Sequence, residues 1–136
     1  FFECGSAKEQ IVMTTYHGSC HCGAVKYEAD VEIKTVTRCT CSLCRKKGAL
    51  LARVDPEALR IDGEVTVYQF NKRIAKHFYC GKCGIHVFSN PRAAPDKYVI
   101  NVQTLDDYDV HTEQPEIRVF DGHNWEDAYA RSQAKS

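Results

Sequence analysis

The stretch that decides the fold is "CGKCG", residues 80–84, read together with "CHC", residues 20–22. Thiols one or two residues apart are too close in the chain to staple distant loops, but they can bind one metal ion together. We therefore predict a four-cysteine zinc site that ties together two segments about sixty residues apart. Its ligands are Cys20, Cys22, Cys80 and Cys83. The alternative is that these thiols are reduced, buried and free of metal. We expect His21, which lies between two ligands, to be solvated or hydrogen-bonded rather than a ligand.

A second cysteine cluster is "CTCSLC", with Cys39, Cys41 and Cys44 inside six residues. Three protein ligands and one open position are typical of a catalytic zinc ion. Two other interpretations remain open: a fourth ligand such as His77 or His86 would close the site, and a disulfide could join the C-x-x-C pair. The open-site interpretation predicts two zinc ions per chain.

The basic run "RKK", Arg45 to Lys47, directly follows the second cluster. Three thiolates and Zn²⁺ carry one net negative charge, and a bound substrate thiolate would add another. The basic run could offset this charge, and the planar guanidinium of Arg45 is best suited to contact a substrate anion. The alternative is a solvated basic turn.

Period-two alternation indicates a mainly β protein built of antiparallel sheets of short strands. Residues 25–32, "VKYEADVE", alternate apolar and charged side chains, and Asp62-Gly63 between residues 59–61 and 65–67 predicts a β-hairpin. We expect a helical turn at "DPEAL", residues 55–59, and a short C-terminal helix capped by Asn124, with Trp125, Ala128 and Tyr129 on one face. Further strands are predicted at residues 49–54, 76–80, 85–89, 97–103 and 116–120.

Length and charge narrow the function class. The 136 residues carry 18 basic and 18 acidic side chains, so the net charge favours neither nucleic acid nor a membrane surface. We expect one zinc-binding domain over residues 13–136, with residues 1–12, Cys4 included, as a remnant of expression or a variable extension. The sequence has no long apolar run and no signal-peptide pattern, and paired thiols suit a reducing compartment, so we expect a cytoplasmic protein.

Four stretches carry a resemblance to a known family: "GSCHCGAVKYE", "CTCSLCRKKGA", "FYCGKCGIHVFS" and "INVQTLDD…PEIRVFDGHNW". In this order they resemble the glutathione-dependent formaldehyde-activating enzymes and the related centromere protein V, which share the Mss4-like fold. The resemblance implies that "CHC" and "CGKC" supply a structural zinc site and "CTCSLC" a catalytic one. It also implies a small thiol partner, glutathione or a relative, and an aldehyde.

The function expected from these observations is that of a zinc-dependent carbon–sulfur lyase, which forms or cleaves an S-hydroxymethyl adduct of a thiol and an aldehyde. Two alternatives belong to other classes. Zinc-braced β folds also serve as protein-binding modules, which predicts an exposed apolar patch. A thiol reductase of the methionine sulfoxide type would use Cys41 or Cys44 as a nucleophile. Two zinc ions per chain favour the lyase, and one favours the alternatives.

Overall fold

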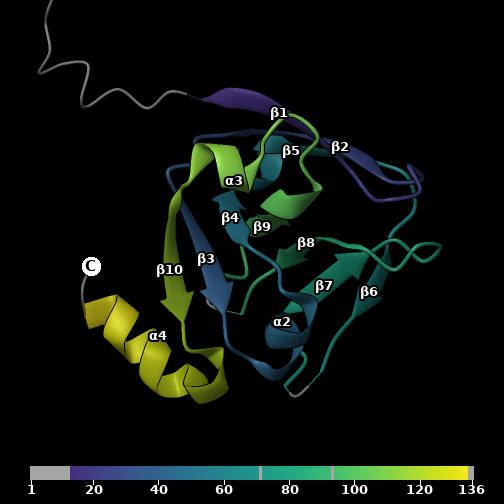
Figure 1. The fold of residues 1–136 in the computed structure, drawn as a ribbon. Helices are drawn as coiled ribbons and strands as arrows, with labels where there is room; N and C mark the ends of the chain where they lie inside the picture. The colour runs from purple at the N-terminus through teal and green to yellow at the C-terminus, as the bar shows by residue number, and fades with distance from the viewer. Residues whose placement is uncertain (1–12, 71, 93, 135–136) are drawn as a thin grey trace, which may run out of the picture.

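The computed structural model describes residues 13–70, 72–92 and 94–134, so the predictions for residues 1–12 and Cys4 lie outside the described residues. The strands form two sheets (Figure 1). The small sheet has the order β1-β2-β5, and the large sheet has the order β10-β3-β4-β9-β8-β7-β6. The predicted mainly β architecture is confirmed.

The small sheet is antiparallel and consists of β1 (Thr14–Ser19), β2 (Lys26–Val31) and β5 (Leu59–Asp62). The alternation predicted for β2 is confirmed, because Tyr27, Ala29 and Val31 are buried while Lys26 and Glu28 are exposed. The sequence analysis missed β1, because "TTYHGS" carries no alternating apolar side chains.

The large sheet combines strands from most of the chain. In spatial order they are β10 (Glu116–Phe120), β3 (Thr35–Cys39), β4 (Leu51–Val54), β9 (Tyr98–Asn101), β8 (His86–Asn90), β7 (Lys76–Tyr79) and β6 (Thr66–Tyr68). Neighbouring strands are antiparallel except β10 and β3, which pair in parallel. Neither β3 nor this parallel pairing was predicted, because β3 buries only Val36 among its five residues.

The hairpin predicted at Asp62-Gly63 is wrong. The strand before the turn, β5, pairs with β2 in the small sheet, whereas β6 pairs with β7 in the large one. The turn therefore carries the chain from one sheet to the other. Gly63 is needed there for two reasons: its φ is +116°, and a Cβ at this position would collide with the carbonyl oxygen of Ala24.

Short helices connect the strands. They are α2 (Ser42–Lys47), α3 (Val110–Glu113) and α4 (Trp125–Ala134), together with the 3₁₀ turns η1 (Pro56–Ala58), η2 (Val102–Thr104) and η3 (Gly122–Asn124). The turn predicted around Pro56 and the C-terminal helix are confirmed. Among the described residues, none of the helices has both the length and the apolar character needed to cross a membrane.

The prediction that Asn124 caps the C-terminal helix is wrong, whereas the predicted inner face of this helix is confirmed. Asn124 belongs to η3, which runs directly into α4, and its amide donates to Asp121 Oδ2 at 2.9 Å. Ala128 is buried, and the rings of Trp125 and Tyr129 stack with centroids 4.8 Å apart. The helix lies beside β10 (Figure 1).

The core contains apolar side chains from both sheets and from the segments that join them. Its most deeply buried members are Val25, Val36, Val87, Ile100 and Val102. Cys20 and Cys80 belong to the same cluster of buried side chains. Two of the four cysteines of the first cluster are therefore part of the core, whereas Cys22 is exposed and Cys83 is partly buried.

Candidate functional site

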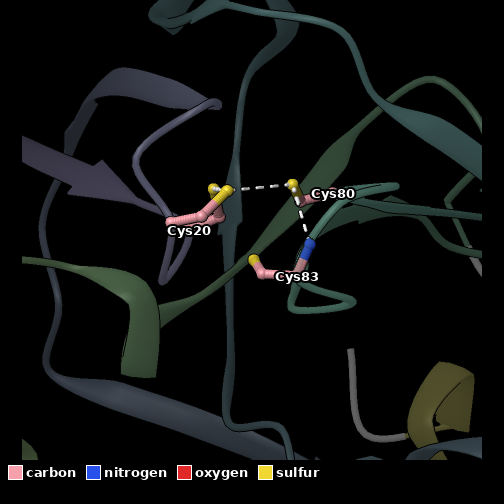
Figure 2. Close-up of side chains that lie close together, drawn as sticks. Cys20, Cys80 and Cys83 are labelled. Atoms are coloured by element: carbon pink, nitrogen blue, oxygen red, sulfur yellow. Dashed lines mark hydrogen bonds between the residues drawn. The ribbon is translucent and has the colours of Figure 1, made fainter.

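The four cysteines of the first cluster converge from two chain segments. Cys20 and Cys22 follow β1, and Cys80 and Cys83 follow β7. Their four sulfur atoms lie within 4.8 Å of one another, and Figure 2 shows the Cys20 side chain facing Cys80 across the gap between the segments. The structure thus brings together the four residues that the sequence pairs suggested.

The spacing of these sulfurs fits a tetrahedral zinc ion. Four sulfurs bound at about 2.3 Å from such an ion lie about 3.8 Å from one another. The Sγ atoms of Cys20 and Cys22 are 3.7 Å apart, as are those of Cys22 and Cys80. The donor set and its spacing are therefore compatible with zinc.

The two halves of the first cluster share one backbone design. The amide of Cys20 donates to the Val25 carbonyl at 3.0 Å, and the amide of Cys80 donates to the Ile85 carbonyl at the same distance. In each half the residue after the second cysteine is a glycine with positive φ, +83° at Gly23 and +79° at Gly84. These tight turns direct amides toward sulfur: Val25 N–H donates to Cys20 Sγ at 3.3 Å.

The second cluster lies at the end of β3 and the start of α2. Cys39 is the last residue of β3, Cys41 is the N-cap of α2, and Cys44 lies within that helix. The Cys41 sulfur accepts the Cys44 amide at 3.3 Å. The three sulfurs lie within 4.8 Å of one another, and among the described residues no histidine or carboxylate joins them. His77 and His86, the fourth ligands considered above, are not members of this group.

Gly122 lets the chain close over the second cluster. A Cβ at this position would collide with Cys39 Sγ and would lie 2.9 Å from the Cys41 Cβ. No role was predicted for this glycine from its place in "DGHNW". Its lack of a side chain is what allows η3 to pack against the cysteines.

The charges of the second cluster explain why it suits a cation. Hydrogen bonds from the Cys39 and Cys44 thiols lower the pKa of Cys41, whereas the pKa of Cys44 is raised by the hydrogen bonds that it donates to Cys39 and Cys41. Without a cation, the three neighbouring thiols therefore resist losing all of their protons. A bound dication would replace these protons and stabilise three thiolates together.

A cleft of about 790 Å³ opens beside the second cluster. Its floor is one face of the large sheet, because alternate residues of a strand point to the same face: Thr35, Thr37 and Cys39 on β3, and Leu51 and Arg53 on β4. Cys41 and Cys44 also line it, as do residues of the β6–β7 segment and of α4. The second cluster is therefore part of the wall of an open site, whereas no cysteine of the first cluster lines this cleft.

The cleft lining is basic. Five side chains carry positive charge, and among the described residues the lining contains no aspartate or glutamate. The five are Arg53, Lys72, Arg73, Arg92 and Arg118. None was singled out in the sequence, because a charged residue between buried strand positions, like Arg53 between Ala52 and Val54, looks like an ordinary solvent-facing one.

Some of these basic residues already interact with other side chains of the protein. The Arg92 guanidinium lies 3.6 Å from the centre of the Trp125 ring and 2.7 Å from Glu126 Oε2. Lys72 Nζ is 3.7 Å from the same oxygen. Arg53 and Arg73 pair with no carboxylate of the described residues, so they are the most available for a ligand.

The residues of the basic run after the second cluster differ in their exposure to solvent. Arg45 is exposed and does not line the cleft, so the structure does not bring it together with the basic residues there. Lys47 is half-buried, and its Nζ lies 3.4 Å from His77 Nδ1. Burial lowers the pKa of Lys47, while thiolates of Cys44 and its neighbours act to raise it. Lys47 is thus the member of the run that faces the cysteines.

Three aromatic residues differ in their surroundings. Trp125 lines the cleft, Phe88 is buried in the core, and Tyr16 packs edge-on against Tyr108 with ring centroids 5.6 Å apart. Of these three, Trp125 is therefore the one that borders the cleft, whereas Phe88 is part of the core.

Comparisons with known proteins agree with this architecture. The family model described as glutathione-dependent formaldehyde-activating enzyme matches residues 15–123, a range that contains all seven clustered cysteines. The solved structure of a Rhodobacter sphaeroides protein is 35% identical in sequence and superposes with a TM-score of 0.68, covering 75% of this chain and 98% of the other. The chain belongs to the family of glutathione-dependent formaldehyde-activating enzymes.

Proposed function

We propose that the protein is a zinc-dependent carbon–sulfur lyase that reversibly joins a thiol to an aldehyde, giving an S-hydroxymethyl adduct. The observation that carries this proposal is the second cluster: three cysteine sulfurs in the wall of an open cleft, with no fourth ligand among the described residues. Three ligands and an accessible position are the pattern of catalytic zinc sites. Family membership supports the same chemistry.

The two clusters have different proposed roles. Cys20, Cys22, Cys80 and Cys83 hold a structural zinc ion, because four sulfurs within 4.8 Å of one another can fill every coordination position of the metal. Cys39, Cys41 and Cys44 hold the catalytic zinc ion. Zinc in the second cluster would supply a position at which a substrate thiol loses its proton near neutral pH. The proposed domain spans residues 13–136.

The residues of the chain then select and orient the thiol. The cleft volume of about 790 Å³ is in the range of small-molecule sites. Its basic lining favours a thiol that carries carboxylates, because guanidinium groups bind carboxylates through charge-assisted hydrogen bonds. Glutathione, with two carboxylates, has this character. Arg53 and Arg73, rather than Arg45, are the proposed anion contacts.

The half-buried Lys47 offsets negative charge at the second cluster. Three thiolates and a zinc ion sum to one negative charge, and a substrate thiolate would double it. An ammonium group that is shielded from water interacts more strongly with such charges than one in solvent. Lys47 therefore has the role that the sequence analysis assigned to the whole basic run. We also propose a reducing, cytoplasmic location, in which seven clustered thiols would stay free to bind metal.

The test combines metal content with activity. Elemental analysis of the wild-type protein should give two zinc ions per chain, and NMR exchange spectroscopy with glutathione and formaldehyde should show faster conversion to the adduct than without protein. Cys41→Ala should retain one zinc ion and lose the catalysed exchange. One zinc ion in the wild type, with no catalysed exchange, would instead favour a protein-binding module or a reductase.

A further inference from the structure

A buried polar row lies in the floor of the cleft, on strands β7 and β8. His77 and Ser89 are partners in the pairing of these strands, and His77 Nδ1 lies 3.0 Å from Ser89 Oγ. The same hydroxyl lies 2.6 Å from His86 Nε2. His77 and Ser89 both line the cleft that contains the second cysteine cluster. Family membership and the proposed function do not account for this row.

The surroundings of His77 determine which nitrogen carries the proton. Lys47 Nζ lies 3.4 Å from His77 Nδ1, and an ammonium group can only donate hydrogen bonds. A proton on Nδ1 would face that cation, so Nδ1 acts as the acceptor. The neutral imidazole therefore carries its proton on Nε2. Burial, together with the charge of Lys47, lowers the pKa of His77 to about 4, which keeps the ring neutral at pH 7.

The Nε2 atom of His77 is buried and has no hydrogen-bond partner among the described residues. Leaving such a donor unsatisfied costs free energy, about 1–3 kcal/mol. The Nδ1 edge of the ring faces Ser89 and Lys47, and one face stacks on Phe70 with centroids 5.8 Å apart. Because His77 lines the cleft, a molecule that enters the cleft and displaces the side chains covering Nε2 can supply the missing partner.

We propose that His77 is a catalytic hydrogen-bond donor, whose Nε2–H binds the aldehyde oxygen as the carbon–sulfur bond forms. This inference rests on the proposed function. The thiolate lone pair forms the bond to carbon, and the π pair of the C=O bond moves to oxygen, which becomes an alkoxide. The alkoxide then takes up one proton from water, and this uptake balances the proton that the thiol released on binding. His77 remains neutral throughout and stabilises the alkoxide, as a preorganised donor does in an oxyanion hole.

Lys47 and Ser89 are positioning residues in this arrangement, because they act on the substrate only through His77. Ser89 holds the ring by its Nδ1 edge, and Lys47 selects the tautomer. His77 and Cys41 also line the same cleft. The donor and the thiol-binding cluster therefore belong to one site.

Two amide substitutions separate this role from a structural one. In His77→Gln the side-chain amide reaches toward the place of Nε2, whereas in His77→Asn it reaches only that of Nδ1. A purely structural role, exerted through Ser89 and Lys47, would be preserved by asparagine. We expect the opposite: His77→Asn should lower the catalysed exchange rate on the order of 100-fold, and His77→Gln by less than about tenfold. His111→Asn, on the exposed helix α3, is the matched control and should leave the rate unchanged.

Two further measurements do not depend on catalysis. Glutathione affinity, measured by calorimetry, should be the same in wild type and His77→Asn, because the donor contacts the aldehyde oxygen. Long-range ¹H–¹⁵N spectra of the wild-type imidazole should show His77 protonated on Nε2, and Lys47→Met should shift the proton toward Nδ1. A proton on Nδ1 in the wild type, or an unchanged rate in His77→Asn, would overturn this inference. The proposed function would still stand if the wild type catalysed the exchange. A wild type inactive with thiol and formaldehyde would overturn both.

Discussion

Replacing Cys80 by serine should strongly destabilise the fold. The Cys80 side chain is only 1% exposed, its sulfur lies 3.7 Å from that of Cys22, and it accepts the amides of Lys82 and Cys83 at 3.4 and 3.5 Å. A serine hydroxyl is neutral and shorter, so it would neither complete a zinc site nor reach these amides.

The magnitude follows from the coupling of metal binding to folding. Structural zinc contributes about 10–16 kcal/mol in small zinc domains, so the loss of one of four ligands removes about 3 kcal/mol or more. The whole stability of a domain is about 5–15 kcal/mol. For a chain of this size, about 1 kcal/mol corresponds to about 4 °C. We therefore expect Cys80→Ser to lower the melting temperature by about 10 °C or more.

The assay is thermal melting followed by circular dichroism, with and without a zinc chelator. It is best done in a Cys41→Ala background, in which the second cluster no longer contributes to chelator sensitivity. Chelation should destabilise the Cys41→Ala protein at least as much as the added Cys80→Ser change, and should have a smaller effect on the double variant. A double variant that melts within about 1 °C of its parent would refute the reasoning, as would one that keeps the full chelator response.

Three other predictions test the second cluster, the cleft and the small sheet. Cys41→Ala should lower zinc from two ions to one per chain in elemental analysis while the circular dichroism spectrum stays native; unfolding would mean that this cluster is structural. In calorimetry, Arg53→Ala should weaken the binding of mercaptopropionate on the order of fivefold without affecting the binding of mercaptoethanol. Arg45→Ala should change the affinity for neither thiol. Weaker binding of mercaptopropionate in Arg45→Ala alone would instead make Arg45 the anion contact. The hydrogen bond to Asp107 raises the pKa of His17 above its usual 6.5, so its stabilising contribution is complete below that value and is lost as pH rises through the raised pKa. Melting curves of wild type and His17→Gln should therefore diverge toward acidic pH, and parallel curves would contradict this.

The two cysteine clusters and much of the secondary structure could be predicted from the order of residues along the chain. Both depend on local spacing: C-x-C and C-x-x-C place thiols within reach of one ion wherever the chain goes, and the alternation in β2 follows from the two-residue period of a strand. Local turn chemistry also predicted η1 at Pro56. The same local reasoning failed at Gly63, because strand partners are chosen by the core that each strand helps to bury.

The surroundings of the cysteines, in contrast, could not be predicted before the folded arrangement of the strands was known. The cleft takes its basic side chains from separate elements, Arg53 from β4 and Arg118 from β10, and nothing in the spacing of these residues relates them. The fold also turned Lys47 inward and left Arg45 in solvent, although they are two residues apart. His77 obtains its partners from α2 and β8, so its tautomer depends on contacts between distant segments. Metal ligands close in the chain are specified by covalent geometry, whereas the charge and hydrogen bonding around them come from packing across the sheet.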